Sequence, residues 1–486
     1  MNKLLLIPLL TLIQTFSFSQ NSIDNAFNIF KESSGLENAS ISFQVIDLSN
    51  SSEISSYNSN TVLPTASTAK LFSTATALDI LGPDYQAKTR VYSDGEIDSL
   101  GTLNGNLWIR GGGDPSLGSK YFNNPSERLN FFQKWIDTLK QKGIKKIAGT
   151  VIADASEFGY EGAPNGWSWV DMGNYYGAGP SGLTLQDNLL EVYFSVPSRA
   201  GLLSTINKIY PEVPNMTFQN QVISANGGGD NAYIYGAPFS MDRFVTGTLP
   251  AGSNNFLVKG SIPDPELQFA YEFKKALLNA NISVDGELKT GRYLQLNSSD
   301  ESYKNKTLII SHLGEKLNSI IEYTNMRSVN LFAEHMINLI GYEKTGNGST
   351  SSGLKVLDDY WAQKIKAKSL FVNDGSGLSR SNAISAEQFN LLMAYMNSSK
   401  YSKEFKKSLP VSGVSGTMVN ICKGTVAHNR IQAKSGSMTR IKSYAGYINT
   451  TNGKQLAFSL IVNNATCSSA SLTDKMELLF TKIATY

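Results

Sequence analysis

Pro64-Thr65-Ala66-Ser67-Thr68-Ala69-Lys70-Leu71 is the stretch that decides the fold of this chain, because it places a serine and a lysine about one helical turn apart. Positions i and i+3 of a helix share a face, so the Lys70 ammonium comes within reach of the Ser67 hydroxyl. Apolar residues then recur at helical spacing, and Gly82-Pro83 supplies the glycine and proline that commonly follow a helix. The sequence therefore predicts a helix that begins near Thr65, ends near Gly82 and carries Ser67 in its first turn.

The residue types around Ser67 suit a nucleophile that is activated by lysine. A serine hydroxyl attacks well only when a base takes its proton. No G-x-S-x-G elbow is present, and none of the three histidines lies in a catalytic signature, which disfavours a Ser-His-Asp triad: His312, His335 and His428. Lys70 is the alternative base, provided that burial or a second cation such as Lys434 favours its neutral form. The Ser67 N–H, unpaired at a helix start, is a candidate oxyanion donor.

A second short motif, Ser328-Val329-Asn330, precedes a predicted helix over 331–339. Ser328 is a candidate to relay a proton to a leaving group. Asn330 is a candidate to hold a substrate amide. A polar helix cap is the alternative interpretation of both residues.

A third motif, Lys434-Ser435-Gly436-Ser437, lies in a predicted strand over 430–437. Strands over 443–448 and 455–462 follow, joined by an Asn-Gly turn, so we expect an antiparallel meander. Gly436 leaves room for a substrate backbone, and the Ser437 N–H is a candidate second oxyanion donor. Lys434 offers a positive charge for a substrate carboxylate, although an ordinary polar edge strand is the alternative.

The three motifs, in this order, form the set shared by serine β-lactamases and penicillin-binding proteins. Over nearly its whole mature length the chain resembles the class C low-molecular-mass penicillin-binding proteins, the D-alanyl-D-alanine carboxypeptidase/endopeptidases of the penicillin-binding protein 4 type. Further segments carry this resemblance: 64–71, 101–107, 112–115, 235–238, 374–378 and 409–413. Two positions depart from the general pattern: Val329 replaces an aspartate, and Ser435 replaces a threonine but keeps the hydroxyl.

The resemblance implies a role for each motif residue. Ser67 would be the acylated nucleophile, Lys70 its base, and Ser328 and Asn330 the second active-site element. The residues from Lys434 to Ser437, which include Ser435 and Gly436, would form the substrate-binding strand.

Spacing predicts the architecture. The gap between Ser67 and Ser328 is far longer than that between Ser328 and Lys434, so a large segment is inserted after the nucleophile helix. We expect an α/β fold: a serine β-lactamase/transpeptidase-like domain, with an antiparallel sheet flanked by helices, formed by 20–90 and 296–486. Short apolar runs and abundant glycine indicate that the insertion, 91–295, is β-rich, and the resemblance implies two small domains there.

Composition is typical of an exported globular enzyme. The 486 residues are 41% apolar and 17% charged, and the net charge of +3 gives no reason to expect nucleic acid as a partner. Residues 1–19 have the basic start, apolar run and small-residue end of a signal peptide, which indicates a periplasmic location. The mature chain has no apolar run of about 20 residues, so no transmembrane anchor is expected. No metal or other cofactor is expected, and Cys422 and Cys467 form either one disulfide or two independent thiols.

Together these features predict a serine-type D-alanyl-D-alanine carboxypeptidase, with possible endopeptidase activity on cross-links. Its partners would be peptidoglycan stem peptides, with β-lactams as covalent inhibitors. A serine β-lactamase is an alternative, but it needs fast deacylation, for which the sequence offers no dedicated base. A non-catalytic peptidoglycan-binding protein is a second alternative, and the retention of all the reactive groups argues against it.

Overall fold

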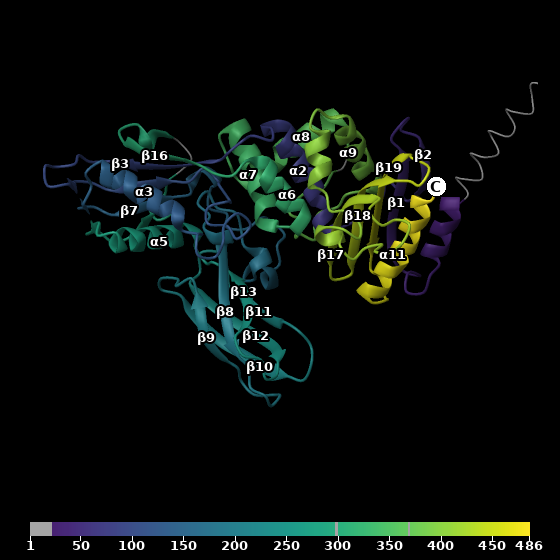
Figure 1. The fold of residues 1–486 in the computed structure, drawn as a ribbon, viewed down its shortest axis with the longest axis horizontal. Helices are drawn as coiled ribbons and strands as arrows, with labels where there is room; N and C mark the ends of the chain where they lie inside the picture. Colours follow the sequence, from purple (N-terminus) through teal and green to yellow (C-terminus); the bar gives the residue numbers. More distant parts are fainter. Residues whose placement is uncertain (1–21, 297–299, 368–369) are drawn as a thin grey trace, which may run out of the picture. The chain divides into compact units, whose positions relative to one another are not determined.

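The computed structural model describes residues 22–296, 300–367 and 370–486. The predicted signal peptide, 1–19, lies outside these described residues. The chain divides into two compact units, each built from separate segments (Figure 1). The first unit contains Met1–Asp79, Ile321–Ser328 and Asp358–Tyr486, and the second contains Ile80–Ile320 and Val329–Leu357. The domain limits expected at 90/91 and 295/296 remain a prediction, because compactness alone does not define a domain.

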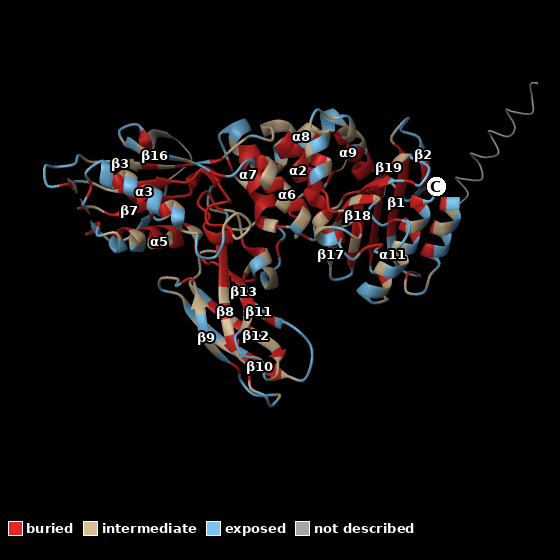
Figure 2. Cartoon of the chain, viewed as in Figure 1, coloured by how far each residue is buried: buried red, intermediate tan, exposed pale blue. Residues whose placement is uncertain are grey.

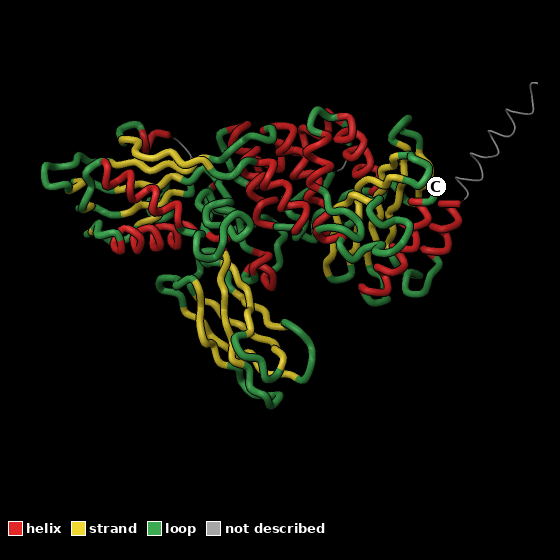
Figure 3. The backbone as a smooth tube through the Cα atoms, in the orientation of Figure 1, coloured by secondary structure: helices red, strands yellow, loops and turns green. Residues whose placement is uncertain are grey.

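A five-stranded antiparallel sheet is the centre of the first unit, where Figure 3 draws its strands in yellow. Its strands follow the order β17-β18-β19-β1-β2. The predicted meander is confirmed, since Ser435 pairs with Tyr444 and Tyr444 pairs with Leu460. β17 lies at the edge of the sheet. The strands are β1 (Ser40–Asp47), β2 (Glu53–Tyr57), β17 (Ile431–Met438), β18 (Ile441–Asn449) and β19 (Gln455–Asn463).

Helices cover both faces of this sheet. Successive side chains of its central strands point to opposite faces, so both faces carry side chains that a helix can bury. On β18, Tyr444 packs against Phe480 of α11 with ring centroids 5.3 Å apart, whereas the Tyr447 hydroxyl donates to the Met393 carbonyl of α9 at 2.9 Å. Figure 2 shows the resulting buried strands. The helices with residues in this unit are α2 (Lys70–Leu81), α6 (Leu317–Arg327), α8 (Thr350–Lys364), α9 (Ala386–Ser398), α10 (Ser402–Ser408) and α11 (Ser469–Ala484). The expected fold class, an antiparallel sheet flanked by helices, is confirmed.

The nucleophile helix ends as predicted, at Leu81, and Gly82 adopts the positive φ of +83° that suits a glycine after a helix. Its start differs from the prediction. Residues Ala66–Ala69 form a 3₁₀ turn, η1, and the α-helix begins only at Lys70. The reason is local: Ala66 has a φ of +49°, so the chain enters the helix through a tight turn.

The rest of α2 is anchored by aromatic packing against α8 and α9. Trp361 of α8 is fully buried, and its Nε1 donates to Thr76 Oγ1 at 2.7 Å. The ring of Phe72 meets Trp361 edge-on at 6.0 Å and lies 5.6 Å from Phe389. These contacts fix the helix that carries Lys70 at its first residue.

Two large apolar cores and smaller apolar clusters lie in the described part of the second unit. Around the first core, α3 and α5 pack against a mixed sheet of order β15-β7-β5-β3-β16 and a small parallel sheet, β14-β6-β4. The elements are β3 (Lys88–Ser93), β4 (Thr102–Leu103), β5 (Leu107–Arg110), α3 (Asn130–Gln141), β6 (Lys146–Ile147), β7 (Val151–Asp154), α5 (Pro265–Asn279), β14 (Ser283–Val284), β15 (Lys289–Thr290) and β16 (Thr307–Leu313).

Around the other core, two three-stranded sheets, β10-β12-β11 and β13-β8-β9, enclose the apolar residues. The strands are β8 (Leu189–Ser195), β9 (Thr205–Tyr210), β10 (Thr217–Ala225), β11 (Asn231–Tyr235), β12 (Asp242–Pro250) and β13 (Phe256–Ser261). The short α4 (Trp169–Met172) and the long α7 (Asn330–Thr345) also belong to this unit, and α7 confirms the helix predicted after the second motif.

Both cysteines are free thiols, so the structure contains two independent cysteines rather than a disulfide. Cys422 is buried, and its Sγ lies 3.9 Å from the Glu477 carbonyl oxygen of α11. Within the described ranges, no helix has both the length and the apolar character needed to cross a bilayer.

Replacing Trp361 by alanine should lower the free energy of unfolding by about 3–5 kcal/mol, because it removes the largest side chain that packs on α2. Urea unfolding of both proteins measures this loss. Leu391→Ala is the control, since Leu391 of α9 is 37% exposed and its truncation should cost far less. Equal losses in the two variants would contradict the account of how α2 is anchored.

Candidate active site

Lys70 and Ser67 are joined by a direct hydrogen bond. Lys70 Nζ donates to Ser67 Oγ at 2.9 Å and to the Ser376 carbonyl oxygen at 2.6 Å. Lys70 has no exposed surface. A buried ammonium is costly, so a protein keeps such a group only where its protons are accepted or can be given away. The predicted proximity of Ser67 and Lys70 is therefore present, in surroundings that favour proton transfer.

The Ser376 carbonyl oxygen, which accepts from Lys70, lies on a turn that the sequence analysis noted only as part of the family resemblance. The Asp374 carboxylate holds this turn, because it accepts from the N–H groups of Gly377 at 2.7 Å and Ser379 at 2.6 Å. The Gly375 carbonyl oxygen accepts from Ser73 Oγ of α2 at 2.6 Å. The D-G-S-G sequence is a turn signal, but only the fold reveals that its carbonyl oxygen faces a lysine.

Lys434 makes a second serine–lysine pair. Its Nζ donates to Ser328 Oγ at 3.0 Å and to the Ser435 carbonyl oxygen at 2.7 Å. Lys434 is also completely buried. Burial, and then the nearby positive charge of Lys70, lowers the pKa of Lys434 well below its usual value. Its predicted contact with a substrate carboxylate remains a prediction, and its position also makes it a proton partner for Ser328.

The backbone at Ser328 has an unusual conformation. It has a φ of +58°, which is uncommon for a residue other than glycine, and it directly follows α6. Val329 is the N-cap of α7 and makes no side-chain cap bond. Asn330 is the first residue of α7, in the second unit, and its Nδ2 donates to the Tyr176 carbonyl oxygen at 2.8 Å.

The strand β17 is pressed against the nucleophile turn at Gly436. A Cβ at this position would lie 2.3 Å from the Thr65 carbonyl oxygen and 2.9 Å from the Thr68 nitrogen. On β18, Ser443 Oγ donates to the same Thr65 oxygen at 2.5 Å. Gly436 is thus needed for η1 to approach the sheet, in addition to the role predicted for it toward substrate.

The first unit therefore brings four predicted residues together as two hydrogen-bonded pairs, Ser67 with Lys70 and Ser328 with Lys434, whose lysines are buried and whose serines are half-buried. Ser435 and Ser437 lie beside them on β17, Ser435 half-buried and Ser437 exposed. The Ser435 hydroxyl donates at 2.8 Å to Thr417 Oγ1, a residue that the sequence analysis did not select. Sequence spacing could not reveal this pair, because Thr417 lies in a short 3₁₀ turn outside the strand that carries Ser435.

A histidine base is not needed at this site, and His335 has a structural position instead. It is buried in the second unit, where its ring nitrogens contact Thr184 Oγ1 at 3.0 Å and the Gly113 carbonyl oxygen at 2.9 Å. Burial lowers the pKa of His335 to about 4, so it remains neutral at neutral pH.

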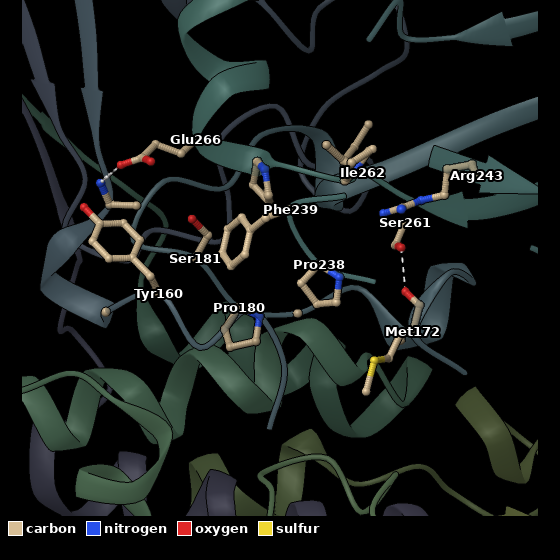
Figure 4. A pocket seen from close by; sticks show the side chains of 17 residues that line it. Tyr160, Met172, Pro180, Ser181, Pro238, Phe239, Arg243, Ser261, Ile262 and Glu266 are labelled. Carbon is tan, nitrogen blue, oxygen red and sulfur yellow. Dashed lines mark hydrogen bonds between the residues drawn. The ribbon is translucent and has the colours of Figure 1, made fainter. Parts of the chain in front are cut away.

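A pocket in the second unit, shown in Figure 4, contains none of the predicted site residues. Phe239, Pro238 and Pro180 line it, and Glu266 lies at its border. The Glu266 carboxyl accepts from the Ala155 N–H at 2.8 Å and from the Gly291 N–H at 3.1 Å. These bonds give Glu266 a role in holding loops together, and burial raises its pKa to about 8.

The profile of the D-Ala-D-Ala carboxypeptidase 3 (S13) family matches residues 23–483. The chain belongs to this family. The resemblance that the three motifs indicated is therefore confirmed, and with it the class of enzyme, a serine-type D-alanyl-D-alanine carboxypeptidase.

Two relatives of the family span most of the chain. A D-alanyl-D-alanine carboxypeptidase of Actinomadura sp. (strain R39) is 26% identical, over 91% of this chain and 80% of its own length. D-alanyl-D-alanine carboxypeptidase DacB of Haemophilus influenzae is 23% identical, over 88% and 86%. The crystal structure of penicillin binding protein 4 from Haemophilus influenzae has the same fold, with a TM-score of 0.78 at 22% identity, covering 93% of this chain and 97% of that one.

The lowered pKa of Lys434 gives a prediction for the pH dependence of stability. An unfolded lysine keeps its proton up to about pH 10.4, whereas buried Lys434 loses it at lower pH. Between the lowered pKa of Lys434 in the folded protein and the pKa of an unfolded lysine, the unfolded chain binds more protons than the folded protein does. The free energy of unfolding therefore increases as the pH rises through this range. Lys434→Met removes this contribution.

Urea unfolding at pH 7 and pH 9.5 tests this sign. Wild-type protein should gain stability, relative to Lys434→Met, as the pH rises. Lys423→Met, at an exposed lysine, is the control and should follow the wild type. If the free energies of unfolding of wild type and Lys434→Met change equally with pH, burial does not lower the pKa of Lys434.

Gly377→Ala should disturb the acceptor turn of Lys70. Gly377 has a φ of +82°, and an added Cβ would lie 1.9 Å from the Ala66 carbonyl oxygen. We expect a loss of about 2 kcal/mol or more in the free energy of unfolding, together with slower acylation by penicillin. Gly453→Ala is the control, because Gly453 has a similar φ of +87° but open space around it. If both variants acylate at the same rate, the turn does not position Lys70.

Proposed function

We propose that this chain cleaves the terminal D-alanyl-D-alanine bond of peptidoglycan stem peptides through an acyl-enzyme on Ser67. The observation that carries the proposal is the hydrogen bond of 2.9 Å between Ser67 Oγ and fully buried Lys70 Nζ. Family membership supports the reaction class and the substrate class.

In the acylation step, the neutral amine of Lys70 takes the proton of Ser67 Oγ while the oxygen attacks the carbonyl carbon of the penultimate D-alanine. Lys70 keeps its orientation because Nζ also donates to the Ser376 carbonyl oxygen. The N–H groups of Ser67 and Ser437 are the proposed donors to the oxyanion that forms on the carbonyl.

Departure of D-alanine requires a proton on its nitrogen. We assign this transfer to Ser328, whose hydroxyl is bonded to Lys434 Nζ. Because Lys434 Nζ donates to Ser328 Oγ at 3.0 Å, it is placed to replace the proton that Ser328 gives away. One lysine then acts as base and the other as acid, which avoids two charged ammonium groups in one buried region.

In the last step, water enters the space left by D-alanine and attacks the acyl carbon, giving one proton to the Ser328–Lys434 pair, which lost a proton to D-alanine. The bond to Ser67 Oγ breaks as Lys70 returns its proton to that oxygen, so both pairs regain their starting protonation. A β-lactam differs here, because its ring-opened fragment stays attached and keeps the space filled. A β-lactamase would need a dedicated base for water, and the family to which the chain belongs favours the peptidase. The crystal structure of the Haemophilus influenzae relative complexed with a β-lactam supports the same use of β-lactams as ligands.

We extend the proposal to the place of action. The signal peptide predicted over 1–19 supports export to the periplasm, where stem peptides and their cross-links occur. Cleavage of cross-links would use the same Ser67 chemistry, because the leaving group is again an amine.

Penicillin should therefore label Ser67, and a stem pentapeptide should release D-alanine over many turnovers. Peptide mapping after labelling locates the adduct, and product analysis measures D-alanine. Ser67→Ala and Lys70→Ala should each lower D-alanine release on the order of 10³-fold or more. An adduct at another serine, or rapid multiple-turnover penicillin hydrolysis without D-alanine release, would overturn the proposal.

A further inference from the structure

The loop that precedes β17 covers part of that strand's free edge. Val411 pairs with Gln432 across an antiparallel bridge, and the Ala433 N–H donates to the Pro410 carbonyl oxygen at 3.0 Å. The loop then turns away through Gly413, with a φ of +71°, and Gly416, with a φ of +56°. Its cover of the strand edge therefore ends just before the residues to which substrate binding is assigned.

At the point where this cover ends, the loop presents a hydroxyl to β17. Thr417, in the 3₁₀ turn η6 (Gly416–Met418), accepts a hydrogen bond of 2.8 Å from Ser435 Oγ. Thr417 is exposed and Ser435 is half-buried. A hydroxyl has a single proton, so the bond uses the proton of Ser435 and leaves that of exposed Thr417 available to another acceptor.

The hydroxyl of Thr417 is not needed to hold the loop in place. The neighbouring Met418 is fully buried in the core of the first unit and anchors η6. Ser415 supports the turn, because its Oγ accepts from the Val411 N–H at 3.0 Å. These contacts hold the backbone of residue 417 beside Ser435, so the loop is expected to keep its place when the Thr417 hydroxyl is removed.

The charge that a substrate carboxylate meets in this region is not directly accessible. Lys434 has no exposed surface, and its Nζ already donates to Ser328 Oγ and the Ser435 carbonyl oxygen. The Ser435 hydroxyl, on the residue that follows Lys434 in β17, and the Thr417 hydroxyl that it contacts are polar groups at this strand edge. Hydrogen bonds to a carboxylate are stronger than neutral ones, and linked hydroxyls polarise one another.

We infer that Thr417 determines specificity for a free C-terminal carboxylate, because its hydroxyl and that of Ser435 together receive the carboxylate of the leaving D-amino acid. The inference rests on the proposed function, since it deepens the description of the same site. In the free protein Ser435 donates to Thr417. When substrate binds, Thr417 donates to one carboxylate oxygen while the Ser435 bond strengthens it as a donor.

The test compares Thr417→Val, which removes the hydroxyl at constant shape, with Thr417→Ser, which keeps it. Substrates are a stem pentapeptide with a free C-terminus and the same peptide as its C-terminal amide. Thr417→Val should lower kcat/KM on the free acid about tenfold or more, mainly through KM, and change it less than about twofold on the amide. Thr417→Ser should retain wild-type preference. Thr451→Val, at an exposed threonine in the β18–β19 turn, is the matched control.

A second readout separates this inference from the proposed function. Acylation of Ser67 by penicillin is compared with acylation by penicillin methyl ester, which lacks the carboxylate charge. If wild-type protein reacts with penicillin but releases no D-alanine, the proposed function fails while the role of Thr417 is still measured. Thr417→Val should slow penicillin and leave the ester nearly unchanged. Equal effects on acid and ester, or no effect on either, would overturn the inference.

Discussion

The complete burial of the Lys70 ammonium is the constraint on which the rest of the active site depends. A lysine without exposed surface must have acceptors at fixed positions, and the structure supplies Ser67 Oγ and the Ser376 carbonyl oxygen. The first requires the tight turn η1 before α2, and the second requires the turn held by the Asp374 carboxylate. Packing of α2 against α8 and α9 then holds Lys70 where its Nζ donates to both acceptors.

In the proposed mechanism, two serine–lysine pairs with buried lysines let a site without a catalytic histidine both remove and deliver protons. Ser67 with Lys70 suits proton removal, and Ser328 with Lys434 suits proton delivery. Burial makes it costly for both lysines to be charged at once, and the lowered pKa of Lys434 reflects this. The same burial withdraws Lys434 from direct contact with solvent, which leaves hydroxyl groups at the strand edge to meet a substrate carboxylate.

Sequence reasoning predicted the parts of the site that depend on local spacing. The proximity of Ser67 and Lys70 was predicted from their spacing of three residues, and the structure keeps it through a 3₁₀ turn; the meander around Lys434 was predicted from strand patterning, and it is present. It could not predict contacts that depend on chain packing. The 3₁₀ start of the nucleophile turn, the Ser376 carbonyl beside Lys70 and the Thr417–Ser435 pair each join residues whose proximity has no signature in spacing. Sequence spacing also does not reveal whether a side chain is exposed. Lys434 was therefore expected to be an accessible charge, whereas it is buried.

The rate of Ser67 acylation by penicillin as a function of pH tests the central claim most directly, since the claim is that a buried lysine acts as the base. Stopped-flow mixing followed by intact-mass measurement gives this rate from pH 5 to pH 10. The account predicts a rise to a plateau that is complete well below pH 10, the range in which an exposed lysine would lose its proton. A rate that keeps rising through pH 10, as expected of a solvated lysine, would contradict it.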